Sequence, residues 1–215
     1  MSARIGMTQN SKKEGIMRII GITGGVGAGK SEIIKYLQKQ YGVEVAIADK
    51  IGHLVMGKGE VCYDDIVDLL GSAIIDKDGE LNRSKIATIV HADKEKLAQL
   101  EAIIHPFVKQ CIIKMIIDAS KRDEKYFFME VPLFFEDNYD KISDEVWYVY
   151  ANCEARCQRL AKSRGYSEEK ASQIMSNQLS DIQFREKCDF VIDNSGDFSD
   201  TINPINARMQ TYETM

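Results

Sequence analysis

A glycine-rich segment near the start of the chain limits the possible folds more than any other part of the sequence. Residues Gly24–Ser31 read GGVGAGKS and match the spacing G-x-x-x-x-G-K-[ST]. They follow a short apolar run at 18–23, typical of a buried strand, and lead into 31–41, where apolar residues recur at helical spacing. A strand, a glycine loop and a helix in this order predict an α/β fold that binds a phosphate where the first strand ends.

The residues of this loop have separate predicted roles in holding a nucleotide. Glycines let the backbone curl so that successive N–H groups point at phosphate oxygens, and the positive end of the helix dipole adds to the attraction. We expect the ammonium of Lys30 to reach the β and γ phosphates of ATP, and the hydroxyl of Ser31 to bind Mg²⁺. The complete predicted cradle consists of Gly25, Val26, Gly27, Ala28, Gly29, Lys30 and Ser31.

Four further apolar runs have the length and composition of buried strands. Helical segments separate them, which favours crossover connections and parallel pairing. We therefore expect a P-loop NTPase fold of the α/β class, with three layers (α/β/α) around a five-stranded parallel sheet. The predicted strands after 18–23 are 43–48, 126–130, 145–150 and 189–193.

Two helical insertions interrupt the expected core of the domain, which spans 17–215 as a single unit. The first, about 50–122, has little strand character and is predicted to form a helical lobe. Pro106 lies within its longest helical pattern and cannot donate a helical hydrogen bond, so we expect a kink or a restart there. The second, about 153–187, is charged and is predicted to form a mobile helical lid. The core segments are then about 17–49, 126–150 and 189–215.

Composition argues against several classes of partner. The formal net charge is −5 and the isoelectric point is near 5.4, so no overall basic field would attract nucleic acid or an anionic membrane. No apolar stretch approaches the roughly 20 residues of a membrane span, and residues 1–16 form a polar extension without the apolar segment of a signal peptide. The five cysteines are scattered, without paired spacing. We therefore expect a cytoplasmic protein, whose oligomeric state the sequence does not indicate.

A phosphate loop alone does not separate kinases from GTPases, motors or regulators. The chain contains no NKxD sequence for guanine recognition and is short for a motor, which favours a small-molecule kinase. Asp49, at the end of the second predicted strand, is expected beside the loop in a parallel sheet. A carboxylate there can orient an acceptor hydroxyl and accept its proton, but it can equally cap a helix starting at Lys50. Two alternatives stay open: another small-molecule or nucleotide kinase, and a nucleotide-binding module without catalysis.

Six segments, taken in order, resemble the dephospho-CoA kinase family. They are IIGITGGVGAGKS, AIADKIGHLV, LNRSKIATIV, LEAIIHPFV, VPLFFE and FVIDNSG, together with an RL-containing lid and its later glutamine. The resemblance runs from about residue 17 to the end of the chain. It implies that ATP phosphorylates the ribose 3′-hydroxyl of dephospho-CoA, which gives CoA and ADP in the final step of coenzyme A biosynthesis.

The resemblance also implies roles on the acceptor side. Asp49 would meet the ribose 3′-hydroxyl, and Lys30 would follow the migrating phosphoryl group. Arg83, His105 and His53 would line the acceptor pocket. From the residues alone, Arg83 is more simply a solvated charge at a helix start, and His105 a hydrogen-bonded histidine at a helix irregularity.

On the nucleotide side, the resemblance implies that Arg159 and Arg185 close over the ATP phosphates, neutralise charge and exclude water. The alternative is that some of these arginines belong to a charged helix face. Asn194, Ser195 and Gly196 would place backbone groups around the adenine, although their sequence is also that of an ordinary turn. The implied catalytic residues are therefore Asp49, Lys30 and Arg159.

The chain departs from the family pattern at three positions. Ile47 replaces the first aspartate of an Asp-Ala-Asp sequence, and we do not expect this change to abolish activity. Glu130 stands before VPL where many members have aspartate, and a carboxylate there could still orient a water on Mg²⁺. Ser163 occupies the place of a second lid arginine, and Arg164, one residue further, turns the charge by about 100° around a helix. The role of Glu130 and the identity of the arginine that completes the lid stay open.

Overall fold

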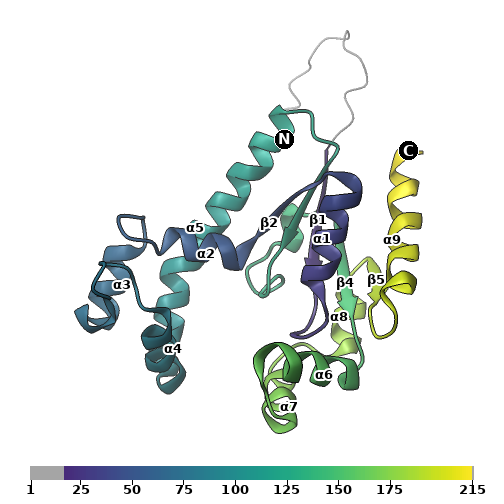
Figure 1. Cartoon of the computed structure of the whole chain (residues 1–215). Coiled ribbons are helices and arrows are strands. Elements are labelled where there is room, and N and C mark those ends of the chain that lie inside the picture. Colours follow the sequence, from purple (N-terminus) through teal and green to yellow (C-terminus); the bar gives the residue numbers. More distant parts are fainter. Residues whose placement is uncertain (1–16, 215) are drawn as a thin grey trace, which may run out of the picture.

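The computed structural model describes residues 17–214, in which five strands form one sheet in the order β2-β3-β1-β4-β5 (Figure 1). All four strand pairings are parallel. β1 lies in the middle, so the glycine loop that follows it opens at the centre of the sheet. The strands are β1 (Arg18–Thr23), β2 (Glu44–Ile47), β3 (Tyr126–Glu130), β4 (Glu145–Tyr150) and β5 (Phe190–Asp193).

The expected five-stranded parallel sheet is confirmed, with small differences in the bounds of two strands. β2 ends at Ile47, one residue before the predicted end, because Ala48 already begins the next helix. β2 and β5 also each start one residue later than predicted. The predicted polar extension at 1–16 lies outside the described residues.

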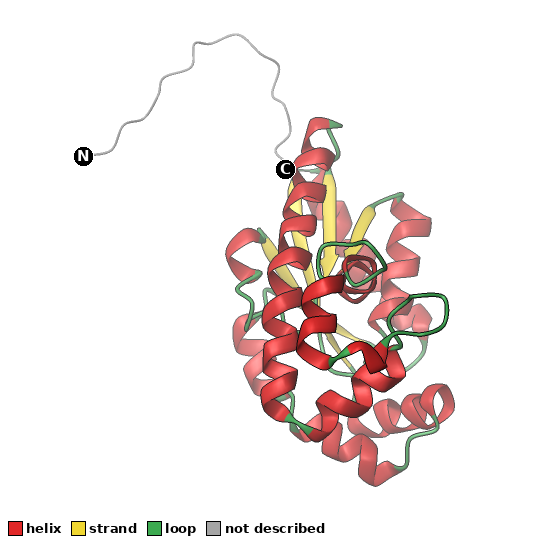
Figure 2. Ribbon diagram, turned by 90° about the vertical axis from the view of Figure 1, so that its left-hand side faces the viewer, coloured by secondary structure: helices red, strands yellow, loops and turns green. Residues whose placement is uncertain are grey.

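Helices cover both faces of the sheet, which gives the predicted three layers (Figure 2). On one face, Ile22 and Trp147 are fully buried in a cluster that includes residues of α1 (Lys30–Tyr41) and α9 (Phe198–Glu213). On the other face, Phe127 is buried in a second cluster, with residues of the helices that connect β2 to β3. Burying each such side chain contributes about 1.5–3 kcal/mol, so packing on both faces holds the sheet between the helices.

Helices α2 to α5 connect β2 to β3 and stand to one side of the sheet (Figure 1). α2, α3 and α4 each pack against α5, the long helix of this segment. We expected a kink or a restart of the helix at Pro106. α5 continues through Pro106 as one helix, so the restart does not occur. The proline removes one hydrogen-bond donor, and α2 packs on both sides of that position, where Gly52 lies next to Ile104 and Val108. The bounds are α2 (Ala48–Val55), α3 (Tyr63–Leu70), a short 3₁₀ turn η1 (Ser72–Ile74), α4 (Arg83–Ala92) and α5 (Lys94–Lys121).

Helices α6 to α8 connect β4 to β5, as the charged helical pattern predicted. Each follows a capping residue, Asn152, Ser167 or Ser180, whose side chain accepts a hydrogen bond from a backbone N–H of the first turn. Figure 1 shows α6 and α7 at the carboxyl ends of the strands. Across residues 17–214, no helix is long and apolar enough to cross a membrane. The bounds are α6 (Cys153–Arg164), α7 (Glu168–Ser176) and α8 (Asp181–Lys187), and a 3₁₀ turn η2 (Asp140–Ile142) precedes β4.

Candidate active site

The carboxyl ends of β1, β2 and β3 meet at one edge of the sheet. Glu130, the last residue of β3, is in register with Ile22 of β1 on one side and Ile47 of β2 on the other. β1 then leads into the glycine loop, and β2 leads into α2, whose second residue is Asp49. Ligands of parallel α/β sheets bind at this edge, so the loop, Glu130 and Asp49 surround the position where such a ligand would lie.

The glycine loop has a backbone shape that only glycine supports at its two ends. Gly24 has φ 145°, and a Cβ there would lie 2.4 Å from the carbonyl oxygen of Val149. Gly29 has φ 93° and immediately precedes α1, and a Cβ there would lie 2.1 Å from the side-chain nitrogen of Asn194. Because Lys30 begins α1, the free N–H groups of the first helical turn face the loop. The predicted order of strand, loop and helix is therefore present.

Lys30 lies between the loop and two carboxylates. Its Nζ donates hydrogen bonds to the carbonyls of Gly24 (2.8 Å) and Gly25 (3.4 Å), and lies 3.7 Å from Oε1 of Glu130. Burial lowers the pKa of Lys30, and the charges of Glu130 and Asp49 oppose that lowering. Burial likewise raises the pKa of Glu130, and Lys30 opposes that rise. The ammonium is thus held inside the site with its charge balanced by acidic groups.

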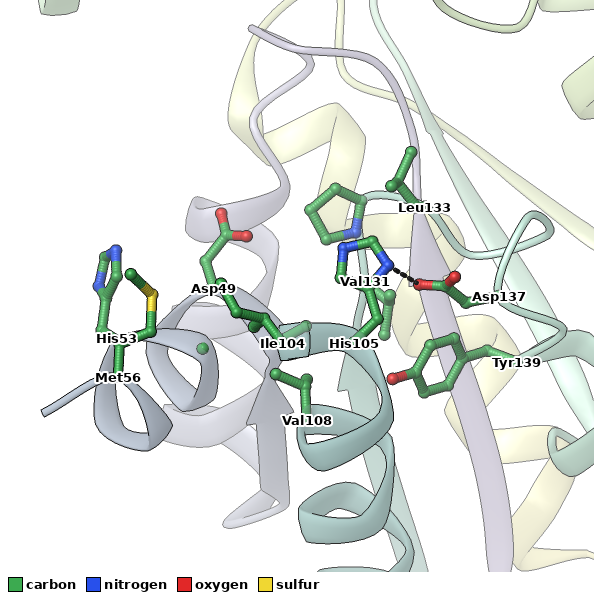
Figure 3. A pocket seen from close by; sticks show the side chains of 13 residues that line it. Asp49, His53, Met56, Ile104, His105, Val108, Val131, Leu133, Asp137 and Tyr139 are labelled. Carbon is green, nitrogen blue, oxygen red and sulfur yellow. Dashed lines mark ion pairs between the residues drawn. The ribbon is translucent and has the colours of Figure 1, made fainter. Parts of the chain in front are cut away.

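Asp49 lies at a cavity of about 240 Å³ between α2, α5 and the loop that follows β3 (Figure 3). The walls are mostly apolar, and Asp49, His53, His105 and Asp137 supply most of the polar groups. The helix-capping alternative for Asp49 does not apply, because α2 begins at Ala48 and no side chain caps it. The carboxylate of Asp49 is exposed at this cavity. It is therefore free to meet a ligand.

His105 is fixed in this cavity by an acidic partner that the sequence did not suggest. Its Nδ1 lies 3.2 Å from Oδ2 of Asp137, and the other ring nitrogen faces the side on which Asp49 lies (Figure 3). One turn later on α5, Nζ of Lys109 donates to the carbonyl of Asp137 at 2.5 Å. Two side chains of α5 thus hold the loop after β3 in place. His53 lines the same cavity and is exposed.

Arg83 does not join this group. It is the first residue of α4, is exposed, and does not line the cavity. This placement agrees with a solvated charge at a helix start. A role for Arg83 in acceptor binding stays a prediction.

α6 places two arginines against the glycine loop. Arg159 donates to the carbonyls of Ala28 (3.3 Å) and Asn194 (2.7 Å). Arg156 is three residues earlier, hence on the same face of the helix, and its Nε donates to the carbonyl of Val26 at 2.8 Å. Arg156 was not among the predicted site residues, although its spacing from Arg159 was a usable signal.

Gln178, between α7 and α8, also contacts the loop and was missed as a site residue. Its Oε1 accepts hydrogen bonds from the backbone N–H of Val26 (3.0 Å) and from Nη2 of Arg156 (2.8 Å). Both backbone polar groups of Val26 are therefore hydrogen-bonded, the carbonyl to Arg156 and the N–H to Gln178. A long-range contact of this kind leaves no periodic pattern in the sequence.

The other predicted lid arginines point elsewhere. Nε of Arg185 donates to both carboxylate oxygens of Asp181 at 2.9 Å, and its guanidinium lies over the ring of Tyr150 at 5.1 Å. Arg164 is exposed, and its guanidinium lies 5.9 Å from the ring of Tyr166. Neither forms a hydrogen bond with the described residues of the loop.

Asn194 supports the loop through its side chain. It is 1% exposed, its Nδ2 donates to the carbonyl of Ala28 at 2.7 Å, and its Oδ1 accepts from the hydroxyl of Thr201 at 3.1 Å. Ser195 accepts a hydrogen bond from the backbone N–H of Asn152. Gly196 is exposed, with open space where a side chain would be. The contact of these three residues with adenine stays a prediction.

A metal site would depend on a bound nucleotide. Ser31 is exposed in the first turn of α1, next to Lys30. Between residues 17 and 214, no group of three or more histidine, cysteine or acidic residues could hold a metal ion. Mg²⁺ commonly uses one or two protein oxygens together with phosphate oxygens and water. The hydroxyl of Ser31, together with the carboxylate of Glu130 at Lys30, fits that donor set.

Comparison with known proteins identifies the family. Residues 18–200 match the family model of dephospho-CoA kinase. A dephospho-CoA kinase of Streptococcus mutans is 33% identical over 196 residues, which cover 91% of this chain and 98% of that protein. A crystal structure from Thermus thermophilus matches with a TM-score of 0.76 at 27% identity, over 91% of this chain and 97% of that one. The dephospho-CoA kinase from Campylobacter jejuni shares the fold, with a TM-score of 0.68 at 24% identity over 89% of this chain and 95% of that one.

The matched region contains the loop, Asp49, the helices α2 to α5 and α6 to α8, and all five strands of the described sheet. The chain therefore belongs to the dephospho-CoA kinase family, which phosphorylates dephospho-CoA with ATP in the final step of coenzyme A biosynthesis.

Proposed function

We propose that the phosphoryl transfer takes place between the glycine loop and the cavity at Asp49, with the ribose 3′-hydroxyl of dephospho-CoA as acceptor. The observation that supports this most directly is the common position of Lys30, Glu130 and Asp49 at one edge of the sheet. Lys30 would bind the phosphates of ATP, and Asp49 would meet the acceptor hydroxyl from the adjacent cavity. A phosphoryl donor and an alcohol acceptor can then meet in line.

Two groups of helices would supply the substrate sites. We assign α2 to α5, within about 50–122, as the acceptor lobe, because Asp49, His53 and His105 line the cavity from these helices. We assign α6 to α8, within about 153–187, as a lid, because Arg156, Arg159 and Gln178 reach the loop from it. The remaining core, about 17–49, 126–150 and 189–215, would carry the loop and the sheet.

Each catalytic group has a separate role in the proposed reaction. Asp49 orients the 3′-hydroxyl and accepts its proton as the oxygen forms a bond to the γ phosphorus. The bond between that phosphorus and the bridging oxygen breaks, and ADP leaves. Lys30 and the loop N–H groups stabilise the charge that develops on the transferred group. Arg159 and Arg156 close the loop side of the site and exclude water.

Mg²⁺ fits the site through Ser31 and the phosphate oxygens of ATP, and when bound it would neutralise phosphate charge and orient the γ phosphate. Glu130 lies near enough to Lys30 to take part in the same charge balance. Cradle contacts from Gly25 to Ser31 would hold the phosphates. Asn194 and Gly196 would lie near the adenine, and Arg185 would join the lid only after leaving Asp181.

We place the reaction in the cytoplasm. All five cysteines are free thiols, which suits a reducing compartment. The net charge of −5 argues against nucleic acid as a partner, so the proposed ligands are ATP and dephospho-CoA alone.

The test is ADP release by the purified protein with Mg²⁺ and ATP, with and without dephospho-CoA. We expect strong stimulation by dephospho-CoA and a product heavier by roughly 80 Da, one phosphoryl group, located at the 3′ position by its fragmentation. A nucleoside monophosphate serves as the competing acceptor. Faster turnover with the monophosphate than with dephospho-CoA, or ATP binding without any acceptor-dependent turnover, would refute the proposal.

A further inference from the structure

A second cavity, of about 390 Å³, adjoins the first at Pro132 and Leu133. Both cavities use these two residues as a shared wall. The second is bounded by the end of β1, by the loop after β3, and by the connection between α7 and α8. None of the predicted site residues lines it.

The floor of the second cavity includes a hydroxyl without a partner. Thr23 is 1% exposed, and its Oγ1 is the one buried side-chain oxygen or nitrogen in residues 17–214 that makes no hydrogen bond. Side chains alternate along a strand, so Thr23 shares a face with Gly21, where a Cβ would lie 2.1 Å from the ring of Phe134. Thr23 therefore faces the loop after β3, where the cavity lies. Buried hydroxyls are normally paired, so this one can pair with a polar group bound in the cavity.

The lining of the second cavity suits an uncharged chain. Asn177 offers an amide group, and the hydroxyl of Ser176, which donates to a backbone carbonyl of its own helix, can still accept a hydrogen bond. Gln178 offers only the NH₂ of its amide, because its oxygen already binds the glycine loop. Leu179 and Phe135 add apolar surface. Glu136 is the one ionisable residue of the lining, and it is acidic. A phosphate would meet no cation there, whereas amide and methyl groups would find complementary partners.

Dephospho-CoA carries such a chain. Beyond its adenosine and diphosphate, the molecule continues as an uncharged arm with two amides, a hydroxyl, two geminal methyl groups and a thiol. The first cavity, at about 240 Å³, is smaller than the roughly 300–1,000 Å³ of sites that enclose an organic ligand. By this comparison, it is too small to enclose the ribose and this arm together. A second compartment, which adjoins it at Pro132 and Leu133, provides the missing space.

We propose that the second cavity binds the amide-bearing arm of dephospho-CoA while the ribose lies in the first cavity. The hydroxyl of Thr23 pairs with a polar group of the arm, Asn177 and Ser176 pair with its amides, and Leu179 and Phe135 contact its methyl groups. This assignment rests on the proposed function, because it takes dephospho-CoA as the acceptor. It adds that the connection between α7 and α8 is part of the acceptor site.

The first test removes the hydroxyl of Thr23 and keeps the shape of the side chain. Thr23→Val is assayed with dephospho-CoA and with the β-methyl ester of ADP, which keeps the nucleotide and diphosphate and lacks the arm. We expect KM for dephospho-CoA to rise about five-fold, the loss of one hydrogen bond. KM for the methyl ester and KM for ATP should stay at the wild-type values. An equal rise with both acceptors, or a rise in KM for ATP instead, would overturn the proposal.

The second test fills the cavity. Ser176→Trp places an indole at its mouth, and Ser172→Trp, on an exposed position of the same helix outside the lining, is the matched control. Calorimetric titration should show at least ten-fold weaker binding of dephospho-CoA to Ser176→Trp, with unchanged binding of the methyl ester and an unaffected control. Wild-type affinity in Ser176→Trp, with circular dichroism showing a folded protein, would exclude the arm from this cavity. Wild-type protein that binds dephospho-CoA but does not phosphorylate it would refute the proposed function while leaving this binding test decisive.

Discussion

Replacing Asn194 with alanine tests whether its side chain supports the glycine loop or contacts the nucleotide. Its side chain is 1% exposed and makes two hydrogen bonds, to the carbonyl of Ala28 at 2.7 Å and from the hydroxyl of Thr201 at 3.1 Å. Each contributes about 1 kcal/mol net, and the void adds to the loss, so Asn194→Ala should lower the free energy of unfolding by about 2–3 kcal/mol. With a urea m-value of about 2 kcal/mol/M, the midpoint should fall by about 1–1.5 M.

The assay is urea unfolding followed by circular dichroism, together with KM for ATP. Asn203→Ala, exposed on α9, is the control and should change stability by less than about 0.5 kcal/mol. KM for ATP should rise in Asn194→Ala, because the Ala28 carbonyl keeps only the longer bond from Arg159, at 3.3 Å. A wild-type urea midpoint together with a large rise in KM for ATP would refute this reasoning, since it would place the side chain at the nucleotide and not under the loop.

Three further predictions concern catalysis and pH. Asp49→Asn should keep ATP affinity and lose about 10²–10⁴-fold in kcat; wild-type turnover would remove Asp49 from its role. Arg156→Ala should lower transfer far more than the exposed control Lys162→Ala on the same helix, measured as CoA formation per ADP released, and equal effects would refute a role at the loop. Burial alone would raise the pKa of Glu145, but hydrogen bonds from Arg208 and other residues lower it below the usual value. Its stabilisation is therefore complete above the unfolded pKa of about 4.3 and is lost as pH falls through the folded value. Urea midpoints from pH 3 to 7 should fall less steeply toward acid in Glu145→Gln, and an unchanged slope would contradict the assignment.

The sheet and the centre of the site could be predicted from sequence because both depend on local patterns. Apolar runs predicted the strands. Glycines such as Gly24 and Gly29 indicated the backbone conformation of the loop. Asp49 follows a strand, and in a parallel sheet all strand ends reach the same edge. The position of Asp49 at the same edge as the loop therefore followed from the parallel direction of the strands.

Contacts between polar side chains far apart in sequence could not be predicted in the same way. Gln178 contacts Val26, which is 152 residues away in the sequence. Asp137, in the loop after β3, contacts His105 on α5. No periodicity marks such pairs, and each depends on how α5 to α8 pack on the core. Arg185 shows the converse: the family resemblance implied a place over the phosphates, whereas Asp181, four residues earlier on the same helix, binds its guanidinium locally.

The lining of the second cavity connects acceptor binding to the glycine loop. Gln178 borders the second cavity and at the same time accepts the hydrogen bond from the N–H of Val26. An arm bound in that cavity would order the connection between α7 and α8, and with it the position of Gln178 and Arg156 on the loop. Closure would then be complete only when the acceptor is present, which is when water must be excluded from the γ phosphate. Slow ATP hydrolysis without dephospho-CoA would be the direct consequence, because the groups that complete the site also form the wall that holds the acceptor.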